Sequence, residues 1–257
     1  MNYGADRLGK RYDADMQKFR DNRLGAFIHW GLYAIPGGEW NGKVYPGAAE
    51  WVKSWAKVPS GEWLELMKQW NPTKFDARKW AKMAKEMGVR YVKITTKHHE
   101  GFCLFDSAYT DYKSTNTKAG RDLVREFVDA FRAEGLHIGF YYSLIDWHHP
   151  DFPIDPLHPR RDDPDAEQQN QGRDMRRYAQ YMRNQVEELL TNYGKIDILW
   201  FDFSYPDTRL EGKDWMKGKG KDDWEAEQLI ALARRLQPGI IIDNRTGLEQ
   251  DLWTPEQ

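Results

Sequence analysis

The chain has 257 residues, a single cysteine and a formal net charge of -2. This length suits one large domain or two small ones, and α/β barrels commonly reach it as a single unit. The lone Cys103 excludes a disulfide framework and a cysteine-based zinc ribbon, and the balance of 38 Lys and Arg against 40 Asp and Glu excludes a general attraction to nucleic acid or to an anionic membrane.

The first twenty residues are rich in charge and lack the apolar core of a secretory signal. They predict a cytoplasmic protein, unless a signal peptide has been removed. No run approaches the roughly 18 apolar residues that span a bilayer, so we expect no membrane partner.

Aromatic residues are unusually frequent, with 12 Trp, 13 Tyr and 11 Phe. An aromatic core explains many of them. They also fit sugar binding, because the flat C–H faces of a pyranose ring pack well on indole rings while the hydroxyls find polar partners nearby.

Five short apolar or aromatic runs predict buried strands, and each ends in polar residues. They cover residues 25–31, 89–99, 137–143, 196–203 and 239–245. Continuous apolar runs favour strands that are covered on both faces, as in parallel sheets. Because helical patterns alternate with these runs, the order of elements predicts βα units and a parallel sheet.

The helical patterns have recognisable starts, stripes and ends. Asp76 is expected to cap a helix that Gly88 ends, with an apolar stripe of Trp80, Met83, Ala84 and Met87. The next stripe, closed by Gly135, consists of Leu123, Val124, Phe127, Val128 and Phe131. A third, closed by Gly194, consists of Met175, Tyr178, Met182, Val186, Leu189 and Leu190, and a fourth helix covers residues 224–236.

Two long loops, residues 149–165 and 207–223, follow the carboxyl ends of predicted strands. Loops in this position often form the walls of an active site. The alternative is that they are simple solvated connections.

Reactive groups in a (β/α)₈ barrel lie at the carboxyl ends of the strands. The predicted ends supply His29, His98, His99, Tyr141, Tyr142, Trp200, Asp202 and Arg245. A single histidine there is most often a satisfied core residue, but the agreement of five strand ends predicts an active site.

Asp202 is the most informative of these residues because it ends a run that should be fully buried. A carboxylate there needs hydrogen-bond or cationic partners to stay ionised. An ionised, oriented and poorly hydrated carboxylate suits a glycosidase nucleophile, and the alternative is an aspartate that caps the next helix. Asp197 begins the same strand, so we expect it at the opposite face of the barrel.

Neighbouring residues on a strand point to opposite faces, so His98 and His99 converge only if the strand ends between them. With His29, Asp202 and His148 they could then form a metal site. Barrel metallohydrolases usually begin with a His-x-His motif on the first strand, and only His29 stands there. We therefore predict neither a metal nor a cofactor.

Four strings carry a strong family resemblance. FIHWGLYAIPGGEW (27–40), TTKHHEGFCLFDS (95–107), GFYYSLIDWHHPD (139–151) and ILWFDF (198–203) resemble the α-L-fucosidases of glycoside hydrolase family 29. The resemblance runs from about residue 20 to the C-terminus. It implies an α/β fold with a (β/α)₈-like barrel, of which about five βα units are evident, and metal-free, retaining hydrolysis of terminal α-linked L-fucose from oligosaccharides or glycoconjugates.

By position, the resemblance makes Asp202 the nucleophile. The residues expected to contact the fucosylated substrate are His29, Glu39, Trp40, His98, His99, Tyr142, Trp200 and Arg245. Strand alternation lets only one of Tyr141 and Tyr142 face the site, and we favour Tyr142. Trp40 is expected to pack against the C5 methyl group of fucose, with Trp55 and Trp147 as alternatives.

The acid/base residue is assigned to Glu256 in the string TPEQ, with Glu249 as its competitor. Glu256 is the penultimate residue, and chain ends tend to fray. It therefore needs neighbouring structure that holds it in place.

Two other functions remain open at this stage, a metal-dependent barrel hydrolase and a non-catalytic fucose-binding protein. We expect a single catalytic domain over residues 1–257. Fucosidases of this type usually continue with further barrel strands and a C-terminal β-sandwich, and we expect neither in this chain. An open barrel would expose strand edges, so we expect a homo-oligomer to cover them, with a truncated chain as the alternative.

Overall fold

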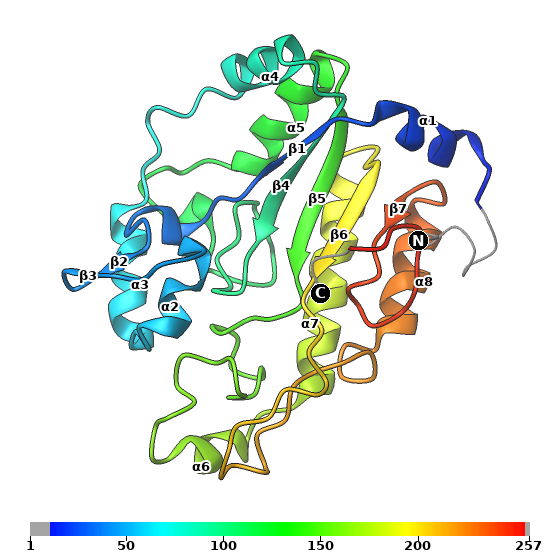
Figure 1. Cartoon of the computed structure of the whole chain (residues 1–257). Coiled ribbons are helices and arrows are strands. Elements are labelled where there is room, and N and C mark those ends of the chain that lie inside the picture. The colour runs from blue at the N-terminus through cyan, green and yellow to red at the C-terminus, as the bar shows by residue number, and fades with distance from the viewer. Residues whose placement is uncertain (1–10, 255–257) are drawn as a thin grey trace.

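The computed structural model describes residues 11–254, and its centre is a five-stranded parallel sheet with helices along one side (Figure 1). The strands lie in chain order: β1 (Gly25–Ile28), β4 (Tyr91–Lys97), β5 (His137–Ser143), β6 (Ile198–Asp202) and β7 (Ile241–Ile242). All five predicted strands and their parallel pairing are confirmed. The architecture is a (β/α)₈-like barrel, and within the described residues its edge strands β1 and β7 do not pair, so the barrel is open.

The remaining elements are α1 (Ala14–Asn22), which precedes β1, and those that fill the connections between the strands. Those before β4 are the 3₁₀ turn η1 (Leu32–Ala34), the hairpin β2 (Glu39–Trp40) and β3 (Lys43–Val44), the 3₁₀ turn η2 (Ala49–Trp51), α2 (Val52–Trp55), α3 (Ser60–Gln69) and α4 (Ala77–Glu86). Those after β4 are the 3₁₀ turn η3 (Ser114–Asn116), α5 (Leu123–Ala133), α6 (Ala166–Asn170), α7 (Met175–Asn192) and α8 (Ala226–Leu236).

The helix boundaries follow the predicted capping signals. The Asp76 carboxylate accepts a hydrogen bond from the Lys79 backbone amide at 3.0 Å, which satisfies one of the open donors at the start of α4. Gly135 and Gly194 follow α5 and α7 with φ of +76° and +72°. A left-handed residue ends a helix at little cost when it is glycine.

The apolar stripe predicted for α4 is wrong in two positions. Met83 and Met87 are 51% and 72% exposed. The buried face instead carries Ala77 and Ala81, with Ala84 packed at its margin. Three alanines at helical spacing bring α4 close to α5, and this rotates both methionines toward solvent. The stripe predicted for α5 is fully buried, as expected.

The two long loops pack against each other rather than lying separately in solvent. Ile154 from the first loop and Met216 from the second share a small apolar cluster with Ala166. The Tyr205 hydroxyl, just before the second loop, donates to Asp155 in the first. Figure 1 shows both loops beyond the arrowheads of the strands, at the end where the site was predicted.

The amino ends of the strands are covered by α1 and by Arg11, the first described residue. The Arg11 guanidinium donates to the Ile240 carbonyl oxygen at 2.9 Å, just before β7. Asp197 lies at this end, with its carboxylate 3.1 Å from the His137 imidazole. Its predicted position, opposite the site, is confirmed.

The segment after β7 folds back onto that strand. The backbone amides of Asp251 and Leu252 donate to the Ile242 carbonyl oxygen at 2.9 and 3.1 Å. Two residues further on, the Thr254 amide donates to the Asn244 side-chain oxygen at 3.0 Å. The chain is therefore held beside β7 up to the last described residue.

Cys103 is completely buried behind the carboxyl end of β4, where it pairs with Lys97 and Lys113 through backbone bridges. Its thiol receives a hydrogen bond from the Gln185 amide at 3.3 Å. Burial raises the pKa of this thiol to about 12. Within residues 11–254, no helix combines the length and the apolar character needed to cross a bilayer.

Candidate active site

The two neighbouring histidines lie just beyond the carboxyl end of β4. The strand ends at Lys97, so His98 and His99 are free of the strand's alternation and their ring centroids lie 4.2 Å apart. Both are buried, and burial lowers the pKa of each imidazole well below its usual range. The expected convergence is confirmed, and both rings are neutral at pH 7.

Asp202 ends β6 and is only 7% exposed. One carboxylate oxygen pairs with the Arg245 guanidinium, and the other accepts a hydrogen bond from the Tyr141 hydroxyl at 2.8 Å. Burial raises the pKa of Asp202, and the Arg245 charge opposes that rise. The carboxylate therefore has the partners that a buried anion requires, and its pairing with Arg245 and Tyr141 distinguishes it from a simple helix cap.

The placement predicted for Tyr142 is wrong. Its hydroxyl donates to the Gln185 side-chain oxygen at 2.7 Å, on the side of β5 that faces α7. Tyr141 faces the site instead. Strand alternation does separate the two tyrosines, but their sequence does not reveal which one shares a face with Asp202. The register does, because Tyr141 pairs with Trp200 and lies on the same face of the sheet as Asp202.

The Glu-Trp pair predicted beside the sugar is also wrong. Glu39 and Trp40 lie in the β2–β3 hairpin, where Glu39 is exposed and Trp40 packs on Trp63 at 5.5 Å. Glu50 and Trp51, at η2, lie beside the histidines instead. The same dipeptide also occurs at residues 62–63. Because Glu-Trp occurs three times, the sequence alone does not identify which pair lies at the site.

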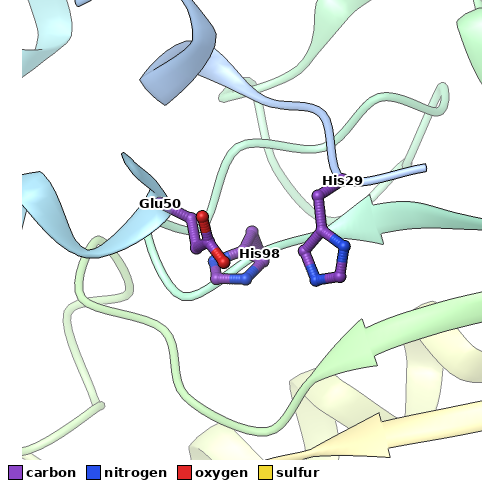
Figure 2. A group of neighbouring side chains, drawn as sticks. All are labelled: His29, Glu50 and His98. Carbon is purple, nitrogen blue, oxygen red and sulfur yellow. The ribbon is translucent and has the colours of Figure 1, made fainter. Parts of the chain in front are cut away.

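Glu50 lies beside His98, and the His29 ring, which comes from a different strand, approaches them (Figure 2). His29 follows β1, His98 follows β4, and one donor atom from each of the three side chains lies within 4.8 Å of the other two. A carboxylate close to two imidazoles can accept hydrogen bonds from hydroxyl groups that the rings also contact. The arrangement suits a polyhydroxylated ligand.

Aromatic rings form one wall of the site around His99. Trp51 lies edge-on to His99 at 4.8 Å, and Trp147 and Phe203 follow at 5.5 and 5.8 Å. Trp55 stacks on the outer side of Trp51 at 6.4 Å. Neither Trp51 nor Phe203 was singled out from the sequence as a contact.

Trp200 lies deeper, on the inward face of β6. The Arg245 guanidinium carbon lies 4.9 Å above its ring centroid, and the Tyr141 ring lies 5.6 Å away. Trp200 therefore packs against both Arg245 and Tyr141, the two side chains that bind Asp202.

Three buried ionisable side chains fix the loops that carry the site. The Lys97 ammonium pairs with one carboxylate oxygen of Asp146 at 3.0 Å. The other oxygen of Asp146 accepts hydrogen bonds from the backbone amides of His148 and His149. The Glu100 carboxylate accepts the Leu32 amide at 2.8 Å and so joins the segment after β4 to the turn after β1.

Two overlapping donor sets in the described residues have the composition of a metal site. His29, Glu50 and His98 form one, and His98, His99 and Asp202 form the other. Neutral imidazoles with a carboxylate suit zinc and similar ions. In the second set both carboxylate oxygens already have partners, and the Arg245 charge opposes a second cation. His148 stands outside both sets, stacked on Tyr112 at 4.0 Å.

The two acid/base candidates have different positions. Glu256 lies outside the described residues. Glu249 is exposed, in the segment after β7. Between them, the Thr254 amide donates to the Asn244 side chain, two residues after the end of β7.

Comparisons with known proteins identify close relatives. A model of the family described as α-L-fucosidase matches residues 3–255. An α-L-fucosidase from Dictyostelium discoideum is 25% identical over 252 residues, which make up 90% of this chain and 49% of that protein. The chain thus spans about half the length of this curated relative.

Two solved structures are similar in fold and sequence. A trapped covalent intermediate of a family 29 α-L-fucosidase from Bacteroides thetaiotaomicron with 2-fluoro-fucosyl fluoride is 52% identical, with a TM-score of 0.76, covering 95% of this chain and 51% of that one. The α-L-fucosidase AlfC from Lactobacillus casei, in complex with its product α-L-fucose, is 30% identical, with a TM-score of 0.78, covering 91% and 71%.

Proposed function

Because the chain belongs to the α-L-fucosidase family, we propose that it is a retaining exo-glycosidase that removes terminal α-linked L-fucose from oligosaccharides or glycoconjugates. The observation that carries the proposal is Asp202, a buried carboxylate held by Arg245 and Tyr141 beside three histidines. It has the environment that a glycosidase nucleophile requires.

In the first step, an oxygen of Asp202 forms a bond to the anomeric carbon while the bond from that carbon to the leaving oxygen breaks. The general acid gives its proton to the leaving oxygen. Arg245 and Tyr141 orient the carboxylate for attack, so little reorganisation is needed when the transition state forms. Water then hydrolyses the fucosyl-enzyme, and the same acid/base residue takes the water's proton.

We assign the acid/base role to Glu256 rather than Glu249. The hydrogen bond between the Thr254 amide and the Asn244 side chain supports this choice, because it holds the chain two residues before Glu256 and next to Arg245. In a retaining enzyme the two carboxyl groups should lie about 5–5.5 Å apart. Glu249, exposed after β7, remains the competitor.

Sugar recognition divides between polar and aromatic side chains. His29, Glu50 and His98 supply donors and acceptors for ring hydroxyls. Trp51 and Phe203 give the apolar faces of the sugar and its methyl group a surface to pack on. Contact with one methyl group discriminates by only about 1–3 kcal/mol, so the hydroxyl contacts carry most of the selectivity.

Replacement of the nucleophile tests the proposal. Asp202→Gly should abolish hydrolysis of an aryl α-L-fucoside, and added azide should restore turnover because it can attack the anomeric carbon in place of the carboxylate. The matched control is Asp197→Asn, directly before the same strand at the opposite end of the barrel, which should keep its activity. Hydrolysis by Asp202→Gly near the wild-type rate would refute the assignment.

We further propose that a second copy of the chain covers the open side of the sheet. Phe27 and Tyr91 on that side are only half-buried, whereas Val92 and Ile94, which face the helices, are fully buried. Apolar side chains left partly in solvent along an open sheet favour association.

A further inference from the structure

The hydrogen bonds behind His99 determine where its ring proton lies. The Ser143 hydroxyl lies 2.7 Å from the Ile145 carbonyl oxygen and 2.6 Å from Nδ1 of His99. A carbonyl oxygen only accepts, so the single hydroxyl hydrogen goes to Ile145. The hydroxyl oxygen must then accept from His99, which places the ring hydrogen on Nδ1.

The opposite nitrogen of the ring faces the nucleophile. Nε2 of His99 is buried without a hydrogen-bond partner among residues 11–254, and it lies 3.9 Å from the Oδ2 atom of Asp202. Burial keeps the ring neutral, so Nε2 carries a lone pair and no hydrogen. Two acceptors therefore face each other across a gap too long for a direct hydrogen bond.

We propose that Ser143 is a positioning residue that holds His99 in the Nδ1–H form, so that His99 can only accept a hydrogen bond from a hydroxyl group of the bound sugar. This inference rests on the proposed function for the identity of the ligand. It adds the direction of the bond, which decides what the site rejects. A group that only accepts, such as fluorine in place of that hydroxyl, would leave Nε2 without a donor.

The direct test is the tautomer itself. In ¹⁵N-histidine-labelled protein, long-range proton–nitrogen correlation spectra should show His99 of the wild type protonated on Nδ1. Ser143→Ala should release the ring into a mixture or into the Nε2–H form, and Ser143→Thr, which retains the hydroxyl, should restore the wild-type signature. Ser107→Ala is the matched control, because Ser107 is equally buried but its hydroxyl contacts Glu188 and Gln185. It should leave the His99 signals unchanged.

The functional test pairs the same variants with methyl α-L-fucosides that carry fluorine at C2, C3 or C4. One analogue should bind the wild type about 10- to 100-fold more weakly than the parent. That penalty should shrink in Ser143→Ala, because a released His99 can donate to fluorine, and it should persist in Ser107→Ala.

The two tests separate the possible failures. An Nε2–H signature for His99 in the wild type would overturn the inference, whatever the enzyme hydrolyses and even if Ser143→Ala fails to fold. Equal fluorine penalties in the wild type and Ser143→Ala would also overturn it. A wild type that shows the Nδ1–H form but neither binds nor hydrolyses fucosides would instead refute the proposed function.

Discussion

Tyr141 and Tyr142 are adjacent, yet one belongs to the site and the other to the core. The Tyr141 hydroxyl donates to Asp202, and this hydrogen bond lowers the pKa that burial raises. The Tyr142 hydroxyl donates a hydrogen bond to the Gln185 side-chain oxygen between β5 and α7. Identical substitutions at the two positions should therefore have different effects.

We expect Tyr141→Phe to lower kcat/KM about 10- to 100-fold, since a hydrogen bond to a charged group contributes about 1.5–3 kcal/mol. It should also move the acidic limb of the pH–rate profile to higher pH, because Asp202 loses a group that favours its ionised form. Tyr142→Phe is the control. It should lower Tm by leaving Gln185 without a donor while kcat/KM stays within about threefold, and an equal loss of activity in both variants would contradict the assignment.

Asp243 is a second buried carboxyl group close to the site. Its Oδ1 atom accepts the Phe201 amide at 3.0 Å, and burial raises its pKa well above the usual range. The folded protein therefore retains a proton that the unfolded chain loses above a pKa of about 3.9. Stability is consequently lost as the pH rises above that value.

Asp243→Asn removes this titration and keeps an oxygen for the Phe201 amide. The free energy of unfolding of the variant minus that of the wild type should increase with pH by up to about 1.4 kcal/mol per unit. Urea unfolding at several pH values between 5 and 7 measures it. A difference that does not change with pH would show that Asp243 is ionised in the folded protein.

At the scale of elements, the strands were predictable and their ends were not. Continuous apolar runs indicate buried strands because both faces of a covered parallel sheet exclude water. β1 nevertheless ends at Ile28, three residues earlier than expected. The Thr95 hydroxyl bonds both to the amide and to the carbonyl of Trp30 and so replaces the ladder there. A side chain that takes the place of a strand partner in this way does not change the apolar pattern of the sequence, so the pattern does not reveal where the strand ends.

β7 is shorter than predicted for a related reason. Only Ile241 and Ile242 pair with β6, and the Ile242 carbonyl is occupied by amides of the segment after β7. The sequence placed Asp202, Arg245 and the histidines at one end of the sheet, because parallel strands share their carboxyl ends. It could not choose among three Glu-Trp pairs, because that choice depends on the path of a turn.

The Lys97–Asp146 pair joins the end of β4 to the segment after β5, and both side chains are fully buried. Lys97→Met should cost about 3–5 kcal/mol of unfolding free energy, because it leaves Asp146 charged and unpaired. Adding Asp146→Asn should recover part of this loss by removing that charge. Lys68→Met, which breaks the exposed pair with Glu65, should cost less than about 1 kcal/mol.

Urea unfolding of the two single variants and the double variant measures these differences. A loss below about 1 kcal/mol for Lys97→Met would show that water or a rearrangement solvates Asp146 in the variant. A double variant no more stable than Lys97→Met alone would show that lost packing, rather than the unpaired charge, causes the effect.

For the whole molecule, the open sheet predicts self-association. Light scattering over a range of concentrations should give a mass of at least twice that of one chain, and specific activity should fall when dilution dissociates the assembly. A monomer with full activity at all concentrations would contradict the proposed second copy.

Chemical labelling of the buried Cys103 can measure how often this part of the molecule unfolds locally. With a thiol pKa of about 12 and no exposed surface, it exists as thiolate in only about one molecule in ten thousand at pH 8, and reagents cannot reach it. Any modification must therefore pass through a state in which the segment behind His98 and His99 has separated from α7. The rate of thiol labelling then reports the free energy of that local unfolding. A ligand that bridges the histidines should slow the labelling, and the experiment needs no engineered cysteine.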